Sequence, residues 1–98
     1  MRVFKVVKPD ATMSKNKTIF DKRYQSLVSE LTKERIRLSI SQDELASNIG
    51  LNQSDVSKIE KFEKRLDVLE LSMILQELRI TENIRLQRII KEFTGVPE

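Results

Sequence analysis

Residues 41–60 read SQDELASNIGLNQSDVSKIE, and this stretch decides how the chain is interpreted. Ser41 and Glu44 have the spacing of a capping box, in which the serine side chain caps the helix and the carboxylate reaches back, so a helix is predicted from Gln42. Three apolar residues on one helical face then lead to Gly50, and glycine most readily adopts the left-handed conformation that ends a helix. The pattern predicts a short helix followed by a tight turn.

A second helix is predicted directly after this turn. Asn52 is a favourable N-cap, and Val56 and Ile59 lie three positions apart, which places them on one inward face. The opposite side of the same helix is polar and partly cationic, with Gln53, Ser54, Ser57, Lys58 and Lys61. This side therefore offers hydrogen-bonding groups to a partner outside the domain.

The two predicted helices resemble the phage-repressor-like (Cro/XRE type) helix-turn-helix family, and the resemblance extends from Arg35 to about Ile80. The matching residues are Ser41, Gln42, Leu45, Ala46, Ile49, Gly50, Leu51, Gln53, Ser54, Val56, Ser57, Ile59 and Glu60. The resemblance implies an all-α, lambda-repressor-like bundle of about five helices with a helix-turn-helix. Phe62 stands where the family usually has a glycine, so the second helix either runs on by a turn or ends differently, with Phe62 packed as an anchor.

The composition agrees with an all-α chain, because only two glycines and two prolines occur in 98 residues. The sequence has no cysteine, which excludes disulfides and thiolate metal sites, and no histidine, which removes the commonest metal ligand and general base. We therefore expect no enzymatic activity, no metal and no cofactor.

Charge and hydropathy bear on location and on partners. No apolar run approaches the roughly 20 residues that cross a bilayer, and the start lacks a secretory signal pattern, so no membrane association and a cytoplasmic location are expected. Residues 1–40 carry ten Lys and Arg against four Asp and Glu, whereas residues 67–98 carry four against six. The positive first part of the chain is compatible with nucleic-acid contact.

Residues 1–20 are interpreted as a non-helical N-terminal segment. The run from Arg2 to Lys8 is β-branched and aromatic until Pro9 ends it, which allows either a short strand paired with a second subunit or a mobile tail. Residues 14–18 form a basic connector, either a plain linker or a segment along DNA phosphates. Residues 21–98 are interpreted as one helix-turn-helix domain with a C-terminal dimerisation helix.

Three further helices are predicted, with their caps: from Asp21 to about Arg37, from Asp67 with Glu70 to Leu78, and from Thr81 with Glu82 until Gly95 and Pro97. The last helix carries the residues predicted to form a homodimer contact: Ile84, Leu86, Ile89, Ile90 and Phe93. The alternative is that this helix folds back over the helix that starts at Asp21.

The resemblance also implies roles for individual residues. It implies a buried ion pair between Arg35 and Glu60, and the alternative is an unpaired surface arginine. The residues predicted to read bases are Gln53, Ser54, Ser57 and Lys58, and those predicted to contact phosphates are Gln42, Asn52, Lys61, Lys64 and Arg65.

Two functions follow as hypotheses. The first is a sequence-specific regulator of transcription, in particular a repressor of the XRE type, which binds double-stranded DNA as a homodimer on a palindromic operator. The alternative is an antitoxin-like or accessory interaction module that grips a protein partner through its terminal segments and regulates its own expression by binding DNA.

Overall fold

The structure, a computed structural model, describes residues 16–95, and these form six helices and no strand. The helices are α1 (Asn16–Phe20), α2 (Lys22–Arg37), α3 (Gln42–Asn48), α4 (Gln53–Glu60), α5 (Val68–Glu77) and α6 (Ile84–Thr94). The predicted all-α fold is confirmed within this range. The strand predicted at residues 2–8, the start of the basic connector and the stop at Pro97 lie outside the described residues.

The expected number of helices was one too few, because α1 lies in the segment that the sequence assigned as non-helical. The α1 helix is held by packing, since Ile19 is buried and its carbonyl oxygen accepts a hydrogen bond of 2.9 Å from Gln25 Nε2 on α2. Such a tertiary contact leaves little trace in local sequence.

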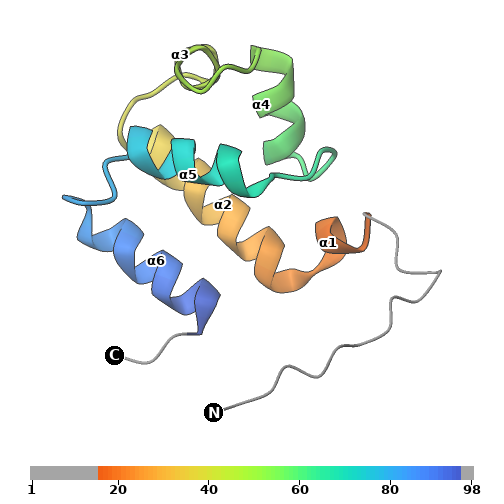
Figure 1. The fold of residues 1–98 in the computed structure, drawn as a ribbon, viewed down its shortest axis with the longest axis vertical. Helices are drawn as coiled ribbons and strands as arrows, with labels where there is room; N and C mark the ends of the chain where they lie inside the picture. Colours follow the sequence, from red (N-terminus) through yellow and green to blue (C-terminus); the bar gives the residue numbers. More distant parts are fainter. Residues whose placement is uncertain (1–15, 96–98) are drawn as a thin grey trace.

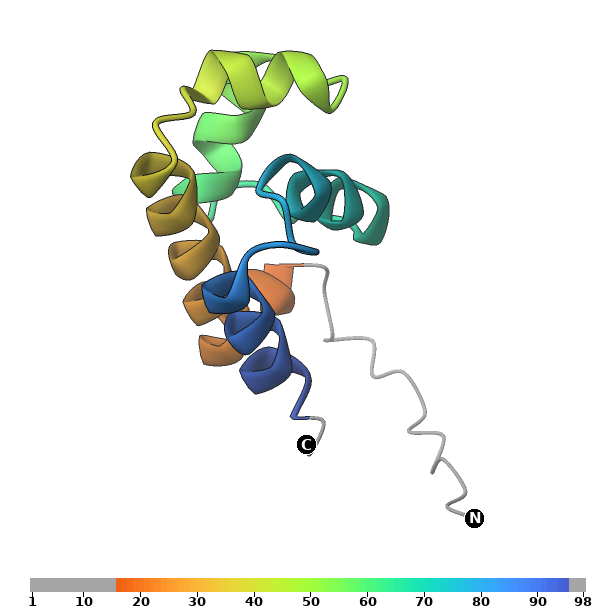
Figure 2. The ribbon, with the colours of Figure 1, turned by 90° about the vertical axis from the view of Figure 1, so that its left-hand side faces the viewer.

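The α2 helix is the centre of the arrangement and contacts α1, α4 and α6. Figure 1 shows α3 and α4 together at one end of the longest axis, while α6 lies toward the other end beside α2. Figure 2 shows the same separation from the side. The α3–α4 pair is therefore mounted on α2 away from the C-terminal helix.

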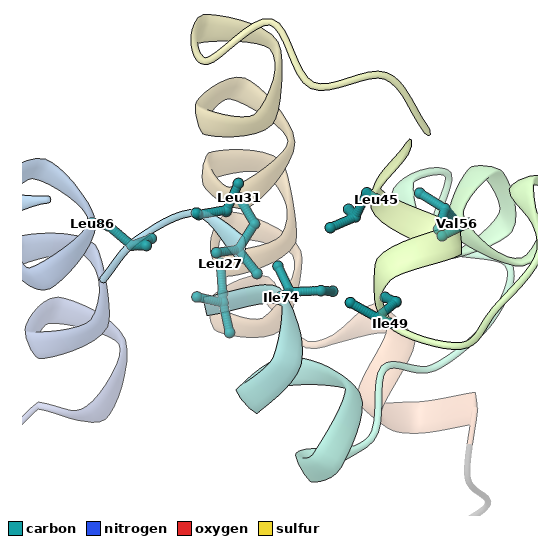
Figure 3. Packing of buried hydrophobic residues seen from close by; sticks show 9 residues of the cluster. Leu27, Leu31, Leu45, Ile49, Val56, Ile74 and Leu86 are labelled. Carbon is teal, nitrogen blue, oxygen red and sulfur yellow. The ribbon is translucent and has the colours of Figure 1, made fainter. Parts of the chain in front are cut away.

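A single apolar core joins these helices, and its members come from five of them: Leu27, Leu31, Leu45, Ala46, Ile49, Val56, Ile74, Leu78 and Leu86. Figure 3 shows Leu27 and Leu31 of α2 between Leu86 on one side and Ile74, Leu45 and Ile49 on the other. A smaller cluster consists of Tyr24, Val28 and Ile59. There the Tyr24 hydroxyl accepts a hydrogen bond of 2.8 Å from the Leu66 N–H, which fastens the α4–α5 connection to α2.

Four of the five predicted helix starts are correct, with Asp21, Ser41, Asn52 and Asp67 as N-caps. Ser41 Oγ accepts from the Glu44 N–H at 3.0 Å, but the Glu44 carboxylate does not bond the Ser41 N–H, so the capping box predicted there is only half formed. The α4 and α5 helices open with reciprocal capping boxes. The prediction that Thr81 caps the last helix is wrong. Asn83 is the cap, because its Oδ1 accepts from the Leu86 N–H.

Phe62 occupies the left-handed position that follows α4, where a glycine is usual in the family that the sequence resembles. The α4 helix stops at Glu60, so it does not run on, and Phe62 adopts the left-handed conformation with φ of 63°. The Phe62 N–H bonds the Ile59 oxygen, and its ring packs against the Tyr24 cluster. These contacts offset the roughly 1–2 kcal/mol that a non-glycine residue pays there. Ser39 and Arg79 end α2 and α5 in the same way, at 60° and 62°.

Candidate nucleic-acid interface

The apolar residues of α4 face the core, and most of its polar residues are exposed to solvent. Val56 and Ile59 are buried, at 2% and 3% exposure. Gln53, Ser54 and Lys58 are exposed, whereas Ser57 is half-buried. Three of the four side chains predicted to read bases therefore lie on an open polar face.

An ion pair fixes the end of α4 on α2. Arg35 Nε lies 2.7 Å from Glu60 Oε2, and Arg35 Nη2 lies 3.1 Å from Glu60 Oε1, so the guanidinium holds both carboxylate oxygens. The two side chains are only 10% and 12% exposed. A third donor, Arg35 Nη1, bonds the Ile40 oxygen at 2.7 Å. The pair that the resemblance implied is thus present, and it also ties the α2–α3 connection to the same arginine.

A hydrogen-bonded chain continues from this pair to the first residue of α4. Gln42 Nε2 donates to Glu60 Oε1 at 2.8 Å, and Gln42 Oε1 accepts from Gln53 Nε2 at 2.7 Å. Gln42, which was predicted to contact phosphate, therefore orients another side chain. Because Gln53 gives one amide hydrogen to Gln42, its exposed amide is held in place and keeps Oε1 and the second hydrogen for further bonds.

Asn52 has mainly a capping role. Its Oδ1 accepts from the Asp55 N–H and from Ser54 Oγ, both at 2.9 Å. The Asn52 N–H bonds Asp55 Oδ2, and this bond, with a smaller effect of Lys64, lowers the pKa of the Asp55 carboxyl. Asp55 is therefore ionised near neutral pH, and it is half-buried. Asn52 keeps its amide N–H groups for an external acceptor.

The basic residues after α4 are not equivalent. Lys61 and Arg65 are exposed, whereas Lys64 Nζ lies 3.3 Å from Asp55 Oδ1. Lys64 is 39% exposed at its side chain, so it can still turn outward, but it must then give up an ion pair. Among the three lysines and arginines predicted to contact phosphate here, Lys61 and Arg65 are the more accessible.

The predicted dimer residues on α6 mostly face inward. Leu86 is fully buried in the core of its own chain, which corrects its assignment to a dimer contact. Ile89, Ile90 and Phe93 are half-buried against that core, and α6 packs on α2, which is the alternative that the sequence left open. Only Ile84 is widely exposed, at 73%.

The sequence did not reveal a second buried charge, Glu34, whose side chain is 2% exposed. Arg37 donates to both Glu34 oxygens, with Nε at 3.1 Å from each, and Asn83 Nδ2 donates at 2.7 Å. Arg85 Nε lies 3.9 Å away. The spacing of Glu34 and Arg37 is a signal for a helix ion pair. The residues near Glu34 in the sequence do not predict that Asn83, far along the chain, bonds the carboxylate.

A scan of protein-family models finds no match to this chain, and a search of curated proteins also finds no match. Within residues 16–95, no group of three or more acidic, histidine or cysteine side chains is arranged to hold a metal ion. No helix in the same range is long and apolar enough to pass through a bilayer.

Proposed function

We propose that this protein binds double-stranded DNA in a sequence-specific manner and regulates transcription, with α4 inserted in the major groove. The observation that carries the proposal is the oriented Gln53. A continuous chain of bonds runs from the buried Arg35 through Glu60 and Gln42 to this amide, at the exposed start of a short helix. A groove-reading helix needs this geometry, with N-terminal side chains aimed at base edges and a rigid mount behind them.

The chemistry of the exposed face suits base edges. The Gln53 amide can accept from and donate to an adenine at once, since its bond to Gln42 uses only one amide hydrogen of an exposed side chain. Lys58, further along nearly the same face, can donate to the acceptors of a guanine. Ser54 and the half-buried Ser57 are secondary contacts, because their hydroxyls are short and that of Ser54 already bonds Asn52.

Phosphate contacts in this proposal fall chiefly to Lys61 and Arg65, with Lys64 and the Asn52 amide in support. Lys61 and Arg65 are exposed beyond the end of α4, where the strands of a duplex would pass. Such contacts supply affinity without sequence preference, and each adds about one unit to the salt dependence of binding.

A homodimer on a palindromic operator, in the cytoplasm, remains part of the proposal. With Leu86 buried, the contact between copies must use apolar side chains that are exposed in the single chain. Among the described residues, the exposed large apolar side chains are Phe20, Ile36, Val68, Leu69 and Ile84. The proposed contact uses Ile84 on α6 with Val68 and Leu69 at the start of α5, which are 73%, 83% and 67% exposed.

Selection of bound duplexes from a random pool tests the proposal, because enrichment of one palindromic sequence is expected. Titrations of Gln53→Ala on that operator and its single-base variants should then show loss of about 1–3 kcal/mol of discrimination at one base pair. Gln76→Ala, an exposed glutamine on α5, is the matched control and should bind like the parent.

Lys61→Ala and Arg65→Ala form the second arm, and each should weaken binding to all sequences while lowering the salt slope by about one. If no sequence is enriched, the DNA proposal fails and the interaction module becomes the better hypothesis. If Gln53→Ala weakens every duplex equally, α4 does not read bases through this residue.

A further inference from the structure

A pocket of about 380 Å³ lies where the end of α2, the end of α5 and the start of α6 meet. Its lining consists of Arg37, Leu38, Leu78, Arg79, Glu82, Asn83, Ile84 and Arg85. Figure 2 shows this side of the molecule, with the α5–α6 turn beside α2 and leading into α6. The α4 helix lies at the other side of the core, so the pocket is separate from the face proposed to read DNA.

Three of the lining residues are arginines, and buried Glu34 sets the position of one of them. Arg37 gives Nε and Nη2 to the Glu34 carboxylate, while its side chain stays 48% exposed at the pocket. A guanidinium has five N–H groups, so Arg37 retains donors in a fixed plane. Because this plane is already ordered, a ligand would lose little side-chain entropy on binding it.

Arg85 and Arg79 complete the cationic lining. Arg85 is 68% exposed and only loosely held, at 3.9 Å from Glu34. Arg79 is exposed and also lines the pocket, with a backbone φ of 62° where glycine would be favoured. Against these three cations stand two carboxylates, buried Glu34 and exposed Glu82, which leaves a positive excess.

The start of α6 adds to this positive field. No acidic residue lies in the first turn of α6, and its macrodipole places partial positive charge at this end. Leu38, Leu78 and Ile84 supply an apolar part of the wall. We propose that this pocket binds a small organic anion, with a carboxylate or phosphate group on the arginines and an apolar body against the leucines. The inference does not depend on DNA binding.

Phenyl phosphate and benzoate are suitable probes, because they share an apolar ring and differ in the anionic group. Each is titrated into the ¹⁵N-labelled chain at constant ionic strength. Saturable shifts are expected in the amides of residues 78–86 for at least one probe, and the tighter probe identifies the preferred group. Arg79→Gln and Arg85→Gln should each weaken binding about tenfold, as for a lost charged hydrogen bond.

Arg88→Gln is the matched control, since Arg88 lies on α6 but does not line the pocket, and its affinity should equal that of the parent. The inference is overturned if neither probe gives saturable shifts at residues 78–86, or if the Arg79 and Arg85 variants bind as well as the Arg88 variant. It is also overturned if duplex DNA, and neither small anion, perturbs these amides.

Discussion

Glu34 and Arg35 are neighbours on α2 and carry opposite charges, yet they hold different parts of the molecule. Arg35 turns toward α4 and grips Glu60, while Glu34 turns toward α6 and binds Asn83 together with Arg37. Successive helical residues differ by about 100° in direction, so adjacent positions can serve two separate interfaces. The α2 helix thereby fixes the proposed reading unit on one side and the C-terminal helix on the other.

The two charge clusters differ in how their charges are shielded from water. In the Arg35–Glu60 pair both side chains are nearly buried, at 10% and 12% exposure, so loss of one strands the other. In the Glu34 cluster only the carboxylate is buried, while the cationic side chains of Arg37 and Arg85 are 48% and 68% exposed. Removal of Glu34 therefore leaves cations that water can solvate. Loss of a charge should therefore destabilise the fold more in the Arg35–Glu60 pair than in the Glu34 cluster.

The largest effect is expected for Glu60→Ala, which should lower the free energy of unfolding by about 3–5 kcal/mol, because Arg35 would remain buried without its counter-ion. Urea denaturation measures this change. Glu63→Ala, an exposed carboxylate in the same connection, serves as control and should stay within about 0.5 kcal/mol of the parent. A loss below about 1 kcal/mol for Glu60→Ala would mean that the pair behaves as an exposed one.

A smaller effect is expected for Glu34→Ala, which should lower the free energy of unfolding by about 1–3 kcal/mol. Asn83 would lose one hydrogen-bond acceptor, whereas water would solvate the two arginines. Hydrogen exchange of the α6 amides should rise more than that of the α3 and α4 amides. Glu30→Ala, whose partner Lys33 is exposed, is the matched control. Equal losses for Glu34→Ala and Glu60→Ala would remove the proposed difference between the two sides.

The pH dependence of stability gives a separate measure of the Glu34 cluster. The hydrogen bonds from Arg37, followed by that from Asn83, lower the pKa of Glu34 below its usual 4.5 despite burial. A carboxyl with a lowered pKa stabilises the fold above its unfolded pKa, and this contribution disappears as pH falls through the folded value. The stability difference between the parent and Glu34→Gln should therefore shrink as pH is lowered from 7 toward 3. A constant difference across this range would contradict the assignment.

The smallest effects concern the left-handed helix ends on the two sides. Arg79→Gly should raise stability by up to about 1 kcal/mol, because it relieves an unfavourable φ without loss of packing. Phe62→Gly relieves a similar φ but removes a ring from the Tyr24 cluster, so a net loss of about 1 kcal/mol is expected. Thermal unfolding of both variants, with Ser39→Gly as a third, decides the signs. Stabilisation by Phe62→Gly would show that the ring contributes little.

Local signals in the sequence were sufficient for most of the helices. Asp21, Asn52 and Asp67 cap helices through bonds to residues two or three positions away, and such spacings are readable without a fold. The pair of Arg35 and Glu60 was accessible only through a family resemblance, since its partners lie 25 residues apart. That resemblance stays a hypothesis about function.

Long-range packing decided the features that the sequence did not predict. Thr81 and Asn83 are both capable caps, and bonds from Asn83 to Glu34 and to the Leu78 oxygen select the second. A glutamate on a long helix is ordinarily solvated. The burial of Glu34 depends on α6, which lies much later in the sequence, so the residues around Glu34 do not predict it. The inward direction of Leu86 has the same origin, because an apolar stripe does not say which surface will cover it.

The hydrogen bond between the Tyr24 hydroxyl and the Leu66 N–H has a spectroscopic consequence. The chain contains one tyrosine, no tryptophan and four weakly fluorescent phenylalanines, so emission excited in the tyrosine band arises from this single phenol. The ring is buried, and its hydroxyl is bound to the α4–α5 connection. Tyrosine emission from the unmodified protein therefore reports on the cluster around Tyr24, including the docking of that connection on α2. Ligand binding that moves the connection can be followed without any added dye.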